Sequence, residues 1–212
     1  MNQFYIYFPM LIFIFILWFK DLSLSFAAPF KIKTLSIITL SILITRYIAL
    51  FILCLAENIK LLYFLKPFYF ASFIAVPVLI LCTIYIIFKN NKINFLYVFL
   101  LEFIALILYI ITLYYFNIVI KVDSSIGFIM LFNNESAYYL YLIEISIILL
   151  LILYLGNIKN FDKAAWISAA VIVLIIEVLL IIMKIRILPE YLAGELITLI
   201  VFGKALNMVK KQ

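Results

Sequence analysis

Residues 94–116 read NFLYVFLLEFIALILYIITLYYF, an apolar run that contains a single acidic side chain, Glu102. A bilayer core about 30 Å thick requires roughly 20 predominantly apolar residues in one α-helix, and this run is long enough. Similar runs lie near residues 3–19, 34–56, 67–88, 137–157, 165–185 and 190–208. The pattern predicts an all-α, polytopic transmembrane helical bundle of seven spans, forming one integral membrane domain over residues 1–212.

The composition of the chain agrees with this class. Hydrophobic residues make up 70% of the sequence and charged residues 12%, with a mean hydropathy of +1.33. The net charge of +6 comes from lysines scattered between the apolar runs, whereas a nucleic-acid footprint would gather them on one face. We therefore expect the protein to lie in a lipid bilayer and to bind no nucleic acid.

The distribution of basic residues predicts the orientation. With the N-terminus outside, the inner loops and tail hold about twice as many basic residues as the outer loops, as the positive-inside rule requires. The first ten residues carry no basic side chain, which favours an uncleaved first helix over a signal peptide. We expect an outer N-terminus and an inner C-terminus. If the last run, which contains Glu190, Glu195 and Lys204, lies on the membrane surface, six spans remain.

The breaks between the runs have chemical causes. Polar turns are expected at residues 20–33, 89–92 and 157–163, and Pro189 precedes the last run. The one long connection, residues 117–136, contains an apolar stretch at 127–132 that is too short to span. We expect that stretch to lie in the interface or to cover the outer mouth of the bundle. Pro77 should bend the third span, and Gly194 and Gly203 should allow close packing in the last.

Several kinds of chemistry lack the residues they need. The chain has no histidine, which excludes histidine-ligated haem or zinc and hydrolysis by a histidine base. Cys54 and Cys82 fall toward opposite membrane faces, so we expect two free packing cysteines. No phosphate-binding loop, metal-ligand cluster or nucleophile elbow is present. We expect no enzyme activity, no cofactor and no metal.

Ionisable residues inside the apolar runs form a candidate intramembrane polar core. A charge at the centre of a span costs roughly 2.5–3.5 kcal/mol on insertion scales, so such residues face the bundle interior and find partners. The members of this core are Arg46, Glu102, Glu144, Glu177 and Glu195. We expect Arg46 to pair with Glu177, either as a ligand-responsive pair or as a structural clamp. Glu144 and Glu195 should form an outer entrance, either to a proton or cation path or as separate hydrogen-bonded carboxyls.

One segment resembles a known family. Residues 64–70, FLKPFYF, which continue to Pro77 and Phe88, are similar to the third helix of the seven-helix sensor region at the N-terminus of some bacterial histidine kinases. The topology, with an outer N-terminus and an inner C-terminus, is similar as well. The resemblance implies a membrane sensor module. No phospho-accepting histidine or kinase domain follows Lys211, so the signalling output is not carried over.

These observations predict a non-enzymatic, sensor-like or accessory subunit that acts through a membrane or cytoplasmic protein partner. The excess of Lys over Arg and the abundance of Ile, Phe, Tyr and Asn are typical of an AT-rich prokaryotic genome, which indicates the cell membrane. The alternative is a small secondary transporter or a proton- or cation-conducting subunit that uses the buried glutamates.

Overall fold

The computed structural model describes residues 4–56, 62–88, 95–123, 127–156, 161–185 and 192–210. Seven helical segments in this part of the chain are long and apolar enough to cross a membrane, which confirms the predicted seven-span, all-α bundle. The long helices are α1 (Phe4–Phe26), α2 (Phe30–Leu55), α5 (Ser72–Phe88), α6 (Phe95–Tyr115), α7 (Ser136–Gly156), α8 (Phe161–Ile182) and α9 (Leu192–Lys210). The predicted turns at 89–92 and 157–163 and the break at Pro189 fall wholly or partly outside the described residues.

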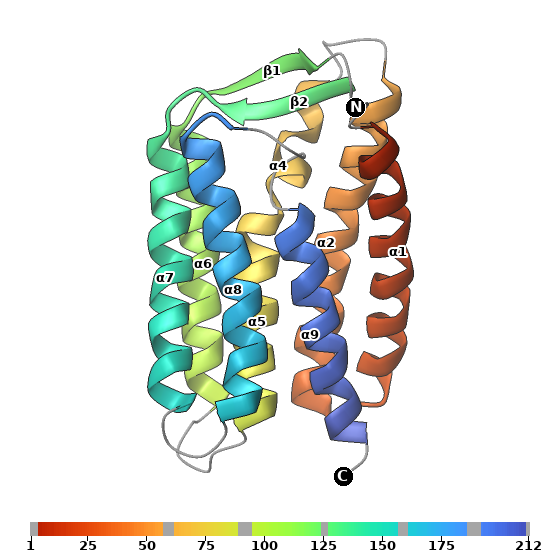
Figure 1. The fold of residues 1–212 in the computed structure, drawn as a ribbon, viewed down its shortest axis with the longest axis vertical. Helices are drawn as coiled ribbons and strands as arrows, with labels where there is room; N and C mark the ends of the chain where they lie inside the picture. Colours follow the sequence, from red (N-terminus) through yellow and green to blue (C-terminus); the bar gives the residue numbers. More distant parts are fainter. Residues whose placement is uncertain are drawn as a thin grey trace.

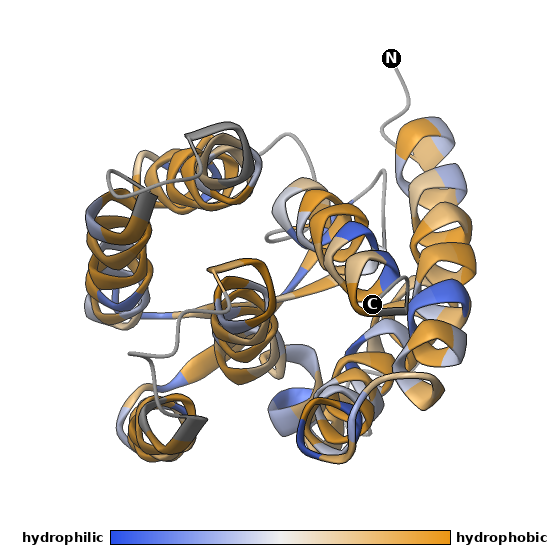
Figure 2. Cartoon of the chain, turned by 90° about the horizontal axis from the view of Figure 1, so that it is seen from below, coloured by the Kyte–Doolittle hydropathy of each residue, from blue (hydrophilic) through white to orange (hydrophobic). Residues whose placement is uncertain are grey.

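The helices surround α5, which runs through the middle of the bundle (Figures 1 and 2). It packs against α2, α6, α7, α8 and α9, and nearly all of its side chains are buried. In contrast, α6 packs chiefly on α5 and leaves most of its aromatic and aliphatic side chains exposed. Apolar side chains on the outer surface suit contact with lipid. The chain begins and ends at opposite ends of the bundle (Figure 1).

Helix α1 extends into the expected turn at residues 20–33 and ends at Phe26, and α2 begins at Phe30. Lys20 and Asp21 therefore lie inside a helix, and the first span is longer than predicted. The reason is a side-chain contact: Asp21 is only 1% exposed and packs against Gly203 of α9. A charged residue does not end a helix where a neighbouring helix leaves space for its side chain.

The third span is interrupted. A 3-10 turn, η1 (Tyr63–Leu65), leads into the short helix α4 (Lys66–Tyr69), and α5 begins only at Ser72. Pro67 occupies the first turn of α4, where its missing N–H costs nothing. The interruption lies at Phe70 and Ala71, more than one turn before Pro77, which stays inside α5. The backbone N–H of Phe73 bonds to the carbonyl of Phe70 rather than to that of Tyr69, so the Tyr69 carbonyl is left for another donor.

The long connection forms a two-stranded hairpin, which the sequence did not predict. Strands β1 (Ile118–Asp123) and β2 (Gly127–Phe132) pair antiparallel, with Ile118 opposite Phe132. The hairpin lies across the end of the bundle where the chain begins (Figure 1), and β2 contacts α2. Gly127, at a φ of +104°, lies so close to α2 that an added Cβ would stand 3.0 Å from the carbonyl oxygen of Leu53. The apolar stretch therefore covers one end of the bundle.

Candidate functional site

Arg46 is the centre of the candidate site. It lies about 24 Å along the axis of α2 from Phe30, well inside the span. The buried positions of α2 recur every three or four residues, and Arg46 takes the place of an apolar residue in that stripe, between Leu43 and Leu50. Its side chain is 0% exposed. A guanidinium stays charged in proteins, so a completely enclosed one must find acceptors within the bundle.

The guanidinium has acceptors from two other parts of the chain. Its Nε atom lies 2.6 Å from Oε1 of Glu195, whose side chain is also 0% exposed. Its Nη1 atom donates to the backbone carbonyl of Tyr69, which the interruption between α4 and α5 has freed. The guanidinium carbon also lies 5.4 Å from the centre of the Tyr69 ring, at cation–π distance. Arg46 thus joins α2, the interrupted third span and the first turn of α9.

The partner of Arg46 differs from the one that the sequence suggested. We expected Glu177 at this position and Glu195 with Glu144 at an outer entrance. Helix α9 begins below the end of α8, inside the bundle (Figure 1). This start brings Glu195 to the level of Arg46. Glu177 stays within electrostatic range of Arg46 without being its ion-pair partner.

Glu177 has a different task, which is to cap α9. Its Oε1 accepts from the backbone N–H of Ala193 at 3.0 Å, and its Oε2 accepts from that of Gly194 at 2.8 Å. The first N–H groups of a helix have no partners within it and carry partial positive charge, so a carboxylate there is favourable. Inside a membrane no water can replace it. Glu177 therefore makes it possible for α9 to begin within the bundle.

Gly194 makes room for this cap. A Cβ at this position would overlap Leu174 of α8 and stand 2.6 Å from Oε2 of Glu177. At Gly203 a Cβ would overlap a carboxylate oxygen of Asp21. The expectation that both glycines allow close helix packing is confirmed.

Tyrosines surround the pair. Tyr7, Tyr47, Tyr69 and Tyr141 are all at most 2% exposed. Tyr47 follows Arg46 in α2 and lies beside the Glu195 carboxylate. Tyr141 of α7 lies within electrostatic range of Arg46, Glu195, Glu177 and also Glu144. Arg46, Glu144, Glu177 and Glu195 therefore all lie within electrostatic range of this one buried tyrosine.

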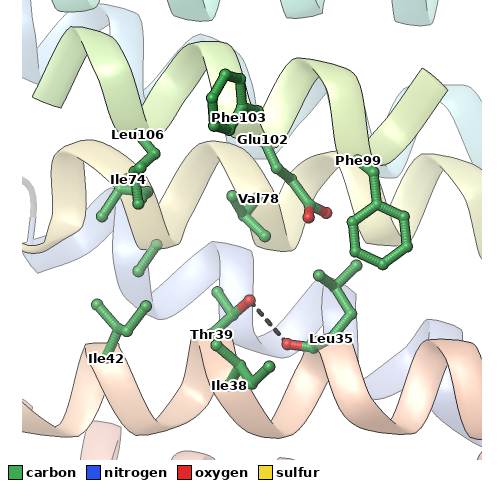
Figure 3. A pocket seen from close by; sticks show the side chains of 11 residues that line it. Leu35, Ile38, Thr39, Ile42, Ile74, Val78, Phe99, Glu102, Phe103 and Leu106 are labelled. Carbon is green, nitrogen blue, oxygen red and sulfur yellow. Dashed lines mark hydrogen bonds between the residues drawn. The ribbon is translucent and has the colours of Figure 1, made fainter. Parts of the chain in front are cut away.

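Glu144 and Glu102 differ from the rest. Glu144 is half-buried on α7, three residues after Tyr141 and within electrostatic range of it. Glu102 lies apart, in a lateral cavity between α2, α5 and α6 (Figure 3). The predicted polar core is thus one cluster around Arg46 and one separate carboxyl.

Two features of this region were missed. Asp21 was assigned to a turn, yet the buried positions of α1 are Tyr7, Leu11, Ile14, Trp18, Asp21 and Ser25, a regular three-and-four spacing that could have revealed it. The Tyr69 carbonyl is a backbone atom whose availability depends on where the helix is interrupted. No residue pattern signals that.

No family model matches the chain, and no curated protein matches it either.

Proposed function

We propose that this membrane protein is a non-enzymatic, sensor-like or accessory subunit, and that the Arg46–Glu195 pair is its responsive element. The observation that carries the proposal is that one guanidinium joins α2 to the α4–α5 break and to the recessed first turn of α9. Breaks between helices and helix ends are places where the backbone can change its arrangement. An ion pair between them stabilises one arrangement over another.

The hairpin supplies a route from the end of the bundle to this pair. The Phe132 ring of β2 lies 4.1 Å from the ring of Phe70, centre to centre, and Phe70 follows Tyr69 in the chain. Phe132 also packs against Phe73 and Tyr138. A ligand or partner that displaces the hairpin would therefore move the segment whose carbonyl binds Arg46. A binding event shifts such an equilibrium only by its difference in affinity for the two arrangements.

The first experiment asks whether the protein has a partner. The tagged full chain, extracted in a mild detergent, should recover a membrane or cytoplasmic protein in stoichiometric amount. Arg46→Gln should weaken that complex or change the partner's output while the helical content stays the same. Lys184→Gln is the matched control, because it breaks the exposed Lys184–Glu135 pair, whose side chains are 81% and 46% exposed. A chain that recovers no partner, or variants that behave alike, would contradict the proposal.

The second candidate is a small secondary transporter or a proton- or cation-conducting subunit. It is favoured by the gathering of Glu144, Glu177 and Glu195 around Tyr141, next to an interrupted helix. Discontinuous helices bind substrates and coupling ions in many transporters. Flux in proteoliposomes that falls for Glu144→Gln or Glu177→Gln, with unchanged stability, would support this candidate over the first.

A further inference from the structure

A cavity of about 250 Å³ lies on the side of the bundle, between α2, α5 and α6. Both α2 and α6 pack on α5, which forms the floor of the cavity with Ala75 and Val78. The rim includes side chains that face outward, among them Ile38 at 54% and Phe99 at 53% exposure. Because these residues lie within membrane-spanning helices, the cavity opens toward lipid rather than toward water.

Among the residues that the structure describes, Glu102 is the single acidic one that lines this cavity. Its side chain points from α6 toward α2 in the close-up view (Figure 3). Glu102 lies about 10 Å along α6 from Phe95, inside the hydrocarbon region. Its Oε1 atom is buried and has no hydrogen-bond partner among the residues that the structure describes. None of the described residues that line the cavity is basic. Glu102 as a whole is half-buried, and its one buried, unpaired oxygen costs free energy that a ligand with the right group would recover.

The second polar group in the cavity also offers an acceptor. The Thr39 hydroxyl donates its hydrogen to the carbonyl of Leu35 at 2.9 Å, so only its oxygen lone pairs remain for a ligand (Figure 3). Phe99 stands three residues before Glu102, on the same side of α6. Two acceptors beside an aromatic ring, in an apolar surrounding, match a protonated amine, which has three donors and binds ring faces.

We propose that this cavity is a binding site for a hydrophobic molecule that carries a primary amine and enters from the lipid. The apolar walls receive the hydrocarbon body, and Glu102 and Thr39 accept hydrogen bonds from the ammonium group. The volume lies just below the 300–1,000 Å³ range that is typical of sites for drug-sized ligands, which suits a single alkyl chain. This inference goes beyond the proposed function, and binding can be measured whether or not the protein senses anything.

The test is a binding assay on the full chain in lipid nanodiscs. Scintillation proximity with tritiated dodecylamine measures binding, and empty nanodiscs give the background from partition into lipid. We expect saturable binding of the amine, with dodecanol, which has the same chain, competing at least about tenfold more weakly. Glu102→Gln should weaken amine binding by about tenfold or more, since a hydrogen bond to a charged group is worth roughly 1.5–3 kcal/mol. Glu144→Gln, which removes a carboxyl outside the cavity, should leave binding unchanged.

A second pair of variants blocks the cavity without touching its carboxyl. Ile38→Trp adds bulk at the rim, while Ile48→Trp adds the same bulk on α2 at a similar exposure, 49%, outside the cavity. We expect only the first to abolish saturable binding. Equal affinity for the amine and the alcohol, or a Glu102→Gln protein that binds the amine as the native chain does, would overturn the role of the carboxyl. Binding that survives Ile38→Trp, or a native chain that gives only the background of empty nanodiscs, would overturn the site itself.

Discussion

Replacing Arg46 by methionine tests the ion pair on which the proposed function depends. The change keeps a long, flexible side chain but removes the contacts to Glu195 and to the Tyr69 carbonyl. Breaking a buried pair costs roughly 3–5 kcal/mol in soluble proteins, whereas interhelical polar contacts in membranes average about 0.6 and reach about 1.7 kcal/mol. Since two contacts are lost and one carboxylate is left enclosed, we expect a free energy of unfolding that is lower by about 2–4 kcal/mol.

A double-mutant cycle separates the pair from its surroundings. Glu195→Met should also destabilise, because it removes the carboxylate that lies 2.6 Å from the buried guanidinium. The Arg46→Met/Glu195→Met protein should lose less than the sum of the two single losses, by about 1.5–3 kcal/mol, because it leaves no unpaired charge. Steric-trapping unfolding in bicelles measures each free energy. Strictly additive losses would show that the two residues do not act as a pair and would refute the reasoning.

The same cycle at an exposed ion pair provides the control. Nζ of Lys184 lies 3.4 Å from Oε1 of Glu135, outside the spans and largely exposed. Such pairs contribute less than about 1 kcal/mol. A coupling between Lys184 and Glu135 as large as that between Arg46 and Glu195 would mean that the assay reports charge changes in general rather than burial.

Three further predictions concern packing near the site. Gly194→Ala should lower the melting temperature more than Gly203→Ala. The new Cβ at residue 194 meets the branched Leu174 side chain and the capping carboxylate, whereas at residue 203 it meets one carboxylate that can move. Thermal unfolding in detergent compares the two variants. Glu177→Ala should lower the free energy of unfolding by about 1 kcal/mol or more, because α9 loses its cap. Glu177→Gln should lower it less, since the amide oxygen still accepts a hydrogen bond. A larger decrease for Glu177→Gln than for Glu177→Ala would contradict this. Phe132→Ala should loosen the hairpin and speed its proteolysis in the native state, whereas a change at Val122, which is 70% exposed, should not.

Local composition was sufficient to predict the fold. Each span needs only a sufficient length of apolar residues, and that requirement is written in consecutive residues such as 94–116. The residues at which the spans begin and end were harder to predict. The first span was ended at its charged residues, but Asp21 continues the buried face of α1 because Gly203 leaves space for it on a helix far away in sequence. The hairpin was missed for a similar reason, since its burial depends on Phe70 and on α2 rather than on its own alternation.

The site shows the same division between local and distant causes. That Arg46 and the glutamates must face the interior follows from the cost of charge in hydrocarbon, and the structure encloses Arg46 and Glu195 completely. Which carboxylate meets which cation depends on relative depth, and depth in turn depends on where each helix begins. Here Glu177 affects two pairings. Its carboxylate caps α9 inside the bundle and so finds its own hydrogen-bond donors. The cap also fixes the depth at which Glu195 meets Arg46. A change that moves the start of α9 by one turn, about 5.4 Å along its axis, would therefore separate Glu195 from Arg46.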